Sequence, residues 1–194
     1  MSETVFIVLF RGINVGGNKV AKMETLRAAL TGAGFGSVAT YIQSGNVVVT
    51  SDMKAAEVEA AIGTLFAETF GFASRPTVRT ADSWRKMIAG NPFPEGAADH
   101  KKLHAVLLDG VPEADAIERL QEKATATEQF TIADGVLYLF TPDGFGISKL
   151  AETLDRSLRV PLTARNWRTV RGTRKDLSNV SASLEMPKPS GVKR

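Results

Sequence analysis

Two stretches of the chain combine residue types that could hold a negatively charged group. The first, residues 10–19, reads FRGINVGGNK. Glycines allow neighbouring N–H groups to converge on an anion near a helix N-terminus, and cationic side chains add charge there. The sequence therefore predicts an anion-binding turn at Arg11, Gly12, Gly16, Gly17 and Lys19. The alternative is that these glycines only supply backbone angles that other residues avoid.

Established nucleotide-binding patterns do not fit this loop. Gly12 and Gly17 have the Walker spacing, but Asn18 occupies the position of the phosphate-binding lysine. Lys19, followed by Val20, occupies the next position, where a Walker loop needs a hydroxyl that holds magnesium. The glycine spacing of a dinucleotide-binding turn is also absent. The loop thus predicts a less specific anion site.

The second stretch, residues 162–175, reads LTARNWRTVRGTRK. Its spacing predicts a short helix that begins with Thr163 as N-cap and ends at Gly172. Three arginines would then share one side of this helix, and guanidinium groups suit phosphate oxygens: Arg165, Arg168 and Arg171.

This arginine row has a structural alternative. It could be a solvated charged face, with Trp167 and Val170 packed in the core. Like charges at this spacing repel each other, which favours an anionic partner or nearby acids such as Glu152 and Asp155.

The charge distribution also points to the C-terminal part. Residues 1–155 hold 14 Lys and Arg against 19 Asp and Glu, whereas residues 156–194 hold 10 against 2. A basic segment attracts polyanions and phosphorylated ligands. We expect a partner of this kind, either a nucleic acid or a phosphorylated small molecule.

Other chemistry has little support in the sequence. The chain has no cysteine, which excludes thiolate chemistry and disulfides. His100 and His104 are the only histidines, and no carboxylate is arranged with them as in a metal site. Ser44 lacks the strand-to-helix elbow of a hydrolase nucleophile. We expect no metal and no cofactor.

Hydrophobic patterning predicts the elements that would position these residues. Residues 5–10 form an apolar run typical of a strand buried on both faces. A helix follows from residue 23, then two strands around the turn Ser44-Gly45-Asn46, a helix over residues 54–70 and an edge strand at residues 74–80. This order is βαββαβ, the ferredoxin-like unit.

A similar order recurs about ninety to a hundred residues later. Residues 103–108 predict a strand, residues 112–125 a helix, and residues 129–133 and 136–140 a hairpin around Asp134-Gly135. A helix over residues 147–158 completes a βαββα pattern. The predicted fold is α+β, with two ferredoxin-like subdomains and mainly antiparallel sheets.

The predicted organisation has four parts. Residues 1–80 form the first subdomain, residues 81–101 a packed helical connector, and residues 102–172 the second subdomain. Residues 173–194 are expected to be a basic, flexible tail. The N-terminal apolar run is too short to span a bilayer. We expect a cytoplasmic bacterial protein that is monomeric and has no membrane partner.

Four blocks together resemble the bacterial family called domain of unknown function 1697: FRGINVGGNK, TYIQSGNVVVTS, YLFTPDGFGISKL and TARNWRTV. They extend over nearly the whole chain apart from its C-terminal tail. The resemblance implies two ferredoxin-like subdomains, which agrees with the patterning. It implies no established activity, substrate or cofactor.

The resemblance also implies which polar positions matter. The matching positions are Arg11, Asn14, Gly16 and Gly17, then Ser44, Gly45 and Asn46, then Ser148 and Lys149, and finally Thr163, Arg165, Asn166 and Trp167. These lie in loops and at element ends, where function concentrates. We expect them to converge on one cleft between the subdomains.

Two function classes follow. The preferred one is a module that binds an anion or phosphate group through the glycine loop and the C-terminal arginines. The alternative is a small enzyme that acts on a phosphorylated or carboxylated metabolite in the cleft, with Lys149 or Ser44 recruited for chemistry. A sheet that binds RNA stacks bases on strand aromatics, and only Tyr138 and Phe140 qualify.

Overall fold

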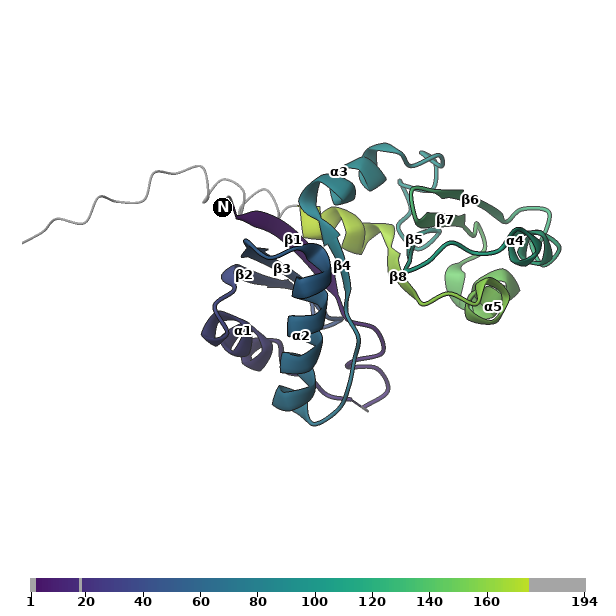
Figure 1. The fold of residues 1–194 in the computed structure, drawn as a ribbon. Coiled ribbons are helices and arrows are strands. Elements are labelled where there is room, and N and C mark those ends of the chain that lie inside the picture. Colours follow the sequence, from purple (N-terminus) through teal and green to yellow (C-terminus); the bar gives the residue numbers. More distant parts are fainter. Residues whose placement is uncertain (1–2, 18, 175–194) are drawn as a thin grey trace, which may run out of the picture.

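The computed structural model describes residues 3–17 and 19–174, and the strands there form two four-stranded antiparallel sheets (Figure 1). The first sheet has the order β2-β3-β1-β4. Its elements are β1 (Thr4–Leu9), α1 (Met23–Gly32), β2 (Gly36–Tyr41), β3 (Asn46–Ser51), α2 (Ala55–Phe70) and β4 (Thr77–Thr80).

The second sheet repeats this topology with the order β6-β7-β5-β8. Its elements are β5 (Leu103–Leu108), α4 (Ala114–Gln121), β6 (Gln129–Ala133), β7 (Val136–Phe140), the short 3-10 helix η1 (Phe145–Ile147), α5 (Lys149–Leu158) and β8 (Leu162–Asn166). Both orders are ferredoxin-like, so the predicted fold class is confirmed.

Strand β1 shows why the apolar run is continuous. Phe6 and Val8 face a core shared with α1 and α2, whereas Ile7 and Leu9 face the opposite side of the sheet. Successive side chains of a strand point to opposite faces, so burial on both sides needs apolar residues at every position. Strand β5 alternates in the same way, with Val106 facing α5.

A third core lies between the two sheets and joins the subdomains. The helix α3 (Ala81–Ala89) and a C-terminal helix of residues 167–174 lie in this region (Figure 1). Trp84 of α3 is only 1% exposed, and its indole N–H donates to the carbonyl of Val170 at 3.2 Å. Trp167 packs in the same core. The connector helix and the C-terminal helix are therefore part of the packing between the subdomains.

The prediction for residues 163–172 is wrong in part. Residues 162–166 form strand β8, which pairs with β5, and the helix begins only at Trp167. Thr163 does not cap it, because the Thr163 hydroxyl contacts the Thr77 hydroxyl at 3.0 Å across the subdomain boundary. The helix also continues through Gly172. Long-range pairing with β5 overrides the local helical spacing.

The strand aromatics that could stack on RNA are not available. Tyr138 is 3% exposed, and its hydroxyl donates to the Met87 carbonyl at 2.9 Å. Phe140 stacks on Phe93 at 5.9 Å between ring centroids. Both side chains belong to the core between the sheets. Base stacking on this sheet face is therefore excluded in the described structure.

The predicted C-terminal boundary of the second subdomain, at residue 172, falls inside a helix. Residues 173 and 174 continue the C-terminal helix, and the buried Thr173 hydroxyl donates to the Thr169 carbonyl. The rest of the predicted tail, residues 175–194, lies outside the described residues. Among the helices described, none is both long and apolar enough to cross a membrane.

Candidate ligand-binding site

Arg165 of β8 lies at the centre of a hydrogen-bond cluster between the subdomains. Its Nε donates to the Asn46 side-chain oxygen at 2.6 Å, and its two terminal nitrogens donate to the carbonyls of Phe10, Ser44 and Ala164. These acceptors carry no net charge. Burial lowers the pKa of this guanidinium to about 10. Arg165 therefore holds the two subdomains together through neutral acceptors.

Asn14 fixes the glycine loop to the neighbouring hairpin. Its amide nitrogen donates to the carbonyls of Ala21 and Gln43 at 2.9 and 2.7 Å, and its oxygen accepts from the Ala21 N–H at 2.8 Å. The structure thus brings Asn14, Ser44 and Arg165 to the same hairpin. Asn14 and Arg165 both donate to backbone carbonyls of this hairpin, so the three residues form a scaffold of internal hydrogen bonds.

Gly45 is enclosed at the centre of this scaffold. Its φ is +76°, and an added Cβ would lie 2.7 Å from Ile13 Cδ1 and 2.9 Å from Phe10 Cβ. The loop glycines differ, because a Cβ at Gly12, Gly16 or Gly17 would meet nothing within 4 Å. Their φ values of +68°, +62° and +76° explain why glycine stands there.

Arg11 forms an ion pair with Asp155 of α5 across the subdomain boundary. One guanidinium nitrogen donates to Asp155 Oδ1 at 2.8 Å and the other to Oδ2. Both side chains are about half exposed, at 50% and 51%. The positive charge of Arg11, which was expected to bind an anion, is therefore neutralised by Asp155. Lys19 has a left-handed backbone conformation, and its N-terminal neighbour lies outside the described residues.

The remaining candidates take separate positions. Ser148 caps α5, with its hydroxyl accepting from the Ala151 N–H at 3.0 Å. Lys149 is the exposed first residue of α5, beside a cavity of about 280 Å³ that Ser148 lines. Asn166 caps the C-terminal helix, because its oxygen accepts from the Thr169 N–H at 2.9 Å. Ser148 and Asn166 are therefore helix N-caps.

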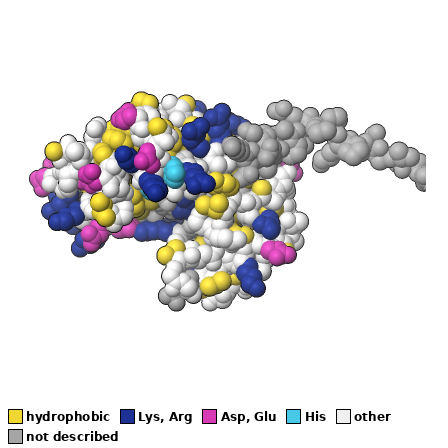
Figure 2. All heavy atoms as spheres, turned by 180° about the vertical axis from the view of Figure 1, so that it is seen from behind, with side chains coloured by type: hydrophobic (Ala, Val, Ile, Leu, Met, Phe, Trp, Pro, Cys, Tyr) yellow, Lys and Arg dark blue, Asp and Glu magenta, His cyan; other side chains and the backbone are white. Residues whose placement is uncertain are grey.

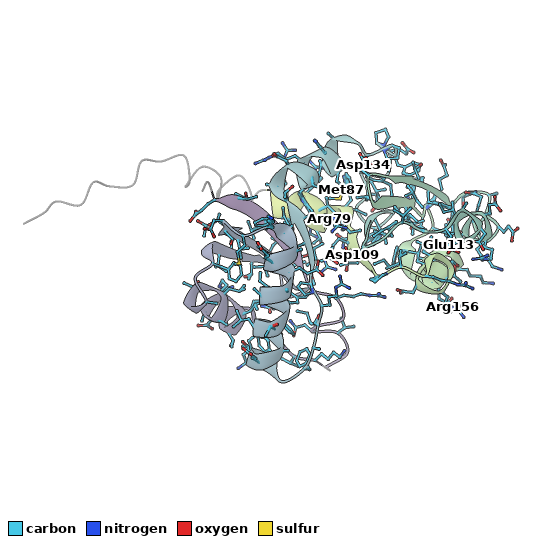
Figure 3. All side chains as sticks on the ribbon, viewed as in Figure 1. Arg79, Met87, Asp109, Glu113, Asp134 and Arg156 are labelled. Atoms are coloured by element: carbon cyan, nitrogen blue, oxygen red, sulfur yellow. The ribbon has the colours of Figure 1, made fainter. Side chains whose placement is uncertain are left out.

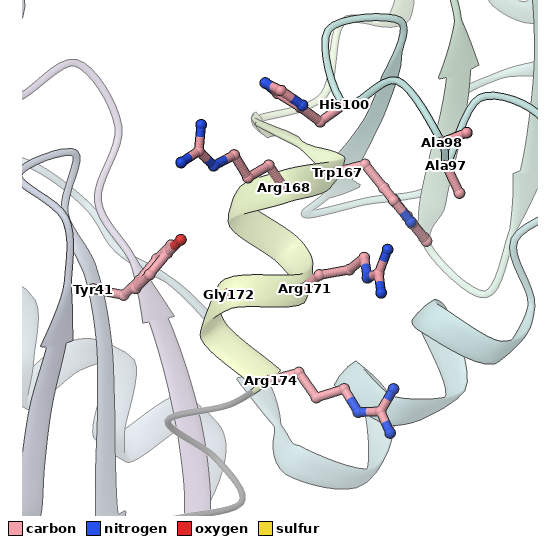
Figure 4. Close-up of a pocket in the computed structure, with 9 residues that line it drawn as sticks. All are labelled: Tyr41, Ala97, Ala98, His100, Trp167, Arg168, Arg171, Gly172 and Arg174. Carbon is pink, nitrogen blue, oxygen red and sulfur yellow. The ribbon is translucent and has the colours of Figure 1, made fainter.

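One cavity of the described structure is a groove of about 810 Å³, which we call the arginine groove (Figure 4). It lies between strand β2, the connector after α3 and the C-terminal helix. Its lining residues are Tyr41, Ala97, Ala98, His100, Trp167, Arg168, Arg171, Gly172 and Arg174. The charged side chains of this lining are all cationic.

Two of its arginines have no acidic partner in the described part of the chain. Arg168 and Arg171 are exposed and lie within 4.0 Å of no carboxylate oxygen there. Several arginines elsewhere are paired with carboxylates, as the pairs Arg75–Glu59, Arg79–Asp109 (Figure 3) and Arg119–Asp115 show. Figure 2 shows Lys and Arg side chains on both sides of a histidine, with an acidic side chain beside them, on the face opposite to that of Figure 1. Arg168 and Arg171 therefore bring positive charge to the groove that no carboxylate of the described residues pairs.

Tyr41 closes one side of the groove against the C-terminal helix. A Cβ at Gly172 would lie within 2.5 Å of three atoms at the end of the Tyr41 side chain, so a larger residue there would displace Tyr41. Asn46 holds the Tyr41 backbone, because its amide nitrogen donates to the Tyr41 carbonyl at 3.1 Å. Since Arg165 donates to Asn46, the hydrogen-bond cluster and the groove share one support.

Sequence reasoning included Arg168 in this site but missed its other walls. Tyr41 and residues 97–100 are far from Arg168 in the sequence and carry no chemical motif. Arg171 was part of the predicted row, and Gly172 was interpreted as a helix end. The spacing of the arginines was the only signal of the groove in the sequence.

The two histidines have different environments. His100 lines the groove, whereas His104 lies on β5 with its ring stacked on Phe145 at 3.9 Å between centroids. His104 Nδ1 is buried without a hydrogen-bond partner. Burial lowers the pKa of His104 to about 4. No group of three potential metal ligands occurs among the residues that the structure describes.

His104 should make the protein less stable in mild acid. The pKa of His104 is ordinarily 6.5 and about 4 in the folded protein. Below about pH 6.5 the unfolded chain therefore binds a proton at His104 that the folded protein does not bind, which favours unfolding. We expect the free energy of unfolding to fall by about 2 kcal/mol more in the wild type than in His104→Phe between about pH 7 and 4.5. Urea denaturation at both pH values measures this. An equal fall in both proteins would contradict the assignment, and His100→Gln serves as the control.

The fold and groove define a protein of two ferredoxin-like subdomains with a cationic groove at their junction. The chain belongs to the family described as "Protein of unknown function (DUF1697)", whose model matches residues 3–138. A solved structure of the conserved bacterial protein SP0830 from Streptococcus pneumoniae is similar to it, with a TM-score of 0.74 and 22% sequence identity. That match covers 91% of this chain and 99% of the pneumococcal one. No curated protein matches the chain.

Proposed function

We propose that this protein is a binding module for a phosphate-bearing ligand, which it holds in the arginine groove. The observation that supports this most strongly is the pair Arg168 and Arg171, exposed in a cavity of about 810 Å³. Cavities of this size accommodate typical small ligands. Guanidinium groups donate two parallel hydrogen bonds to phosphate oxygens, which makes phosphate the matching anion.

The proposal moves the binding site away from the glycine loop. Arg11 is neutralised by Asp155, and Asn14 uses its amide in bonds to the backbone. The donors of Arg165 that the structure pairs all reach internal acceptors. In this proposal, Arg165 supports the groove wall through Asn46 and the Tyr41 carbonyl, and Arg168 and Arg171 contact the ligand. One chain supplies every wall, so the proposal needs no second copy.

Neutralising the groove should weaken binding of a simple phosphate probe. We expect Arg168→Gln/Arg171→Gln to bind inorganic tripolyphosphate at least about tenfold more weakly than the wild type, because each charge-assisted hydrogen bond contributes about 1.5–3 kcal/mol. Isothermal titration calorimetry at low salt measures the affinity. The probe needs no base or sugar, so the result tests phosphate recognition alone.

The matched control removes the same charge elsewhere. Lys123 and Arg156 are exposed on the second subdomain and do not line the groove. Lys123→Gln/Arg156→Gln should therefore bind tripolyphosphate nearly as well as the wild type. If both double variants lose affinity equally, the attraction is a general charge effect and the groove is not the site. Absence of any binding by the wild type would also refute the proposal.

A further inference from the structure

We propose that the ligand of the arginine groove is a single-stranded nucleic acid, whose backbone crosses the C-terminal helix. This inference rests on the proposed function and names its ligand class. Three observations lead to it: the directions of the arginine side chains, the absence of acidic groups from the groove lining, and the position of Tyr41.

The arginines point in different directions. Figure 4 shows the Arg168 side chain extending toward the His100 end of the groove, while Arg171 and Arg174 extend from the other side of the helix. Residues three apart are separated by about 4.5 Å along a helix axis and by about 60° around it. In the directions that Figure 4 shows, the guanidinium groups of Arg168 and Arg171 do not converge on a single phosphate group. A ligand that contacts both needs phosphates at separate points, as a nucleic acid strand provides.

The groove lining has no acidic side chain among its nine described residues. Nucleoside triphosphates usually bind with Mg²⁺, which proteins hold through carboxylates near the phosphates. Phosphodiesters carry one charge each and need only cationic or N–H donors. The lining thus matches a phosphodiester backbone better than a magnesium-bound triphosphate.

Tyr41 supplies an aromatic side chain at the edge of this cationic track. It is partly exposed and held in place against Gly172, whereas Trp167 is 3% exposed and forms the floor. Proteins that bind single strands combine a basic groove with aromatic rings on which bases stack. A concave groove on the protein suits a single strand, because reading a duplex requires a protein surface that protrudes into the major or minor groove of the nucleic acid. Of the sheet aromatics, Tyr138 is buried and Phe140 is partly buried against Phe93, so neither presents a free ring face for this part.

Fluorescence anisotropy with labelled oligothymidylates tests the ligand class. We expect affinity to rise with length up to about eight nucleotides and then level off, within the site sizes of single-strand binders. The slope of log affinity against log salt should be about −1.4 to −2, which corresponds to two or three phosphates. Arg168→Gln/Arg171→Gln should reduce both the affinity and this slope.

Tyr41→Leu separates stacking from charge. It should weaken binding of the octanucleotide roughly tenfold while leaving the salt slope unchanged. Tyr41→Phe should bind like the wild type, and urea denaturation checks that both variants remain folded. An unchanged octanucleotide affinity in folded Tyr41→Leu would overturn the role of Tyr41 in base stacking.

The outcomes distinguish this inference from the proposed function. If tripolyphosphate binds in the groove but the octanucleotide binds no tighter than thymidine monophosphate, the ligand is a small phosphorylated molecule and the inference is wrong. A duplex of the same length that binds as tightly as the single strand would also overturn it. If neither tripolyphosphate nor any oligonucleotide binds, the proposed function itself fails.

Discussion

Replacing Arg165 by methionine is expected to lower the free energy of unfolding by about 3 kcal/mol. Methionine keeps much of the side-chain volume but removes the donors. The Asn46 side-chain oxygen and the carbonyls of Phe10 and Ser44 would then lose their bonds to Arg165 at the subdomain junction. A buried acceptor without a partner costs about 1–3 kcal/mol, which is why the effect should be large for a single residue.

Urea denaturation of Arg165→Met measures this loss. Arg168→Met is the matched control, because it removes an exposed arginine three residues away and should change stability by less than about 0.5 kcal/mol. Arg165→Lys keeps the charge but has a single nitrogen, so we expect an intermediate loss. If Arg165→Met and Arg168→Met have the same stability, the hydrogen bonds of Arg165 contribute nothing net.

Replacing Trp84 by alanine should destabilise the protein by about 4 kcal/mol. Its ring is 1% exposed and lies in the core between the two sheets, where a cavity cannot be filled from solvent. The change also removes the indole N–H that donates to the Val170 carbonyl. Val170 belongs to the helix that carries the groove arginines. Tripolyphosphate affinity should fall as well, although Trp84 does not line the groove.

The free energy of unfolding and the binding affinity of the same sample test this prediction. Trp84→Phe fills most of the space and should cost about 1–2 kcal/mol, mainly through the lost indole hydrogen bond. Ile147→Ala is the surface control, because Ile147 is 76% exposed, and it should change stability by less than about 0.5 kcal/mol. A loss below about 1.5 kcal/mol for Trp84→Ala would show that the connector helix is not an anchor of the core.

The first subdomain and the β6–β7 hairpin of the second could be predicted in detail because their signals are local. The apolar run at β1, the helical stripe of α2 and the Asp134-Gly135 turn of the second half each depend on residues close in sequence. Arg165 shows the opposite case. Its spacing from Arg168 and Arg171 favoured a helix, but residues 162–166 pair with a strand almost sixty positions earlier. Local spacing contains no information about such a partner.

The candidate site was predicted less well for the same reason. The polar positions Asn14, Ser44 and Arg165 do lie together, as expected from the family pattern. Their hydrogen bonds, however, are directed inward, and no sequence pattern states whether a donor will find its acceptor within the chain. The groove walls at Tyr41 and residues 97–100 meet only after both sheets have packed.

The packing of the C-terminal helix between the sheets has a consequence for the newly made chain. On the ribosome, β1 is synthesised first, and its inner residues Ile7 and Leu9 belong to the core that Trp167 and Val170 complete. Those two partners leave the ribosome more than 150 residues later. The core on this face of the first sheet therefore stays incomplete until the C-terminal helix has been made, which lengthens the period of exposure to aggregation and to chaperones.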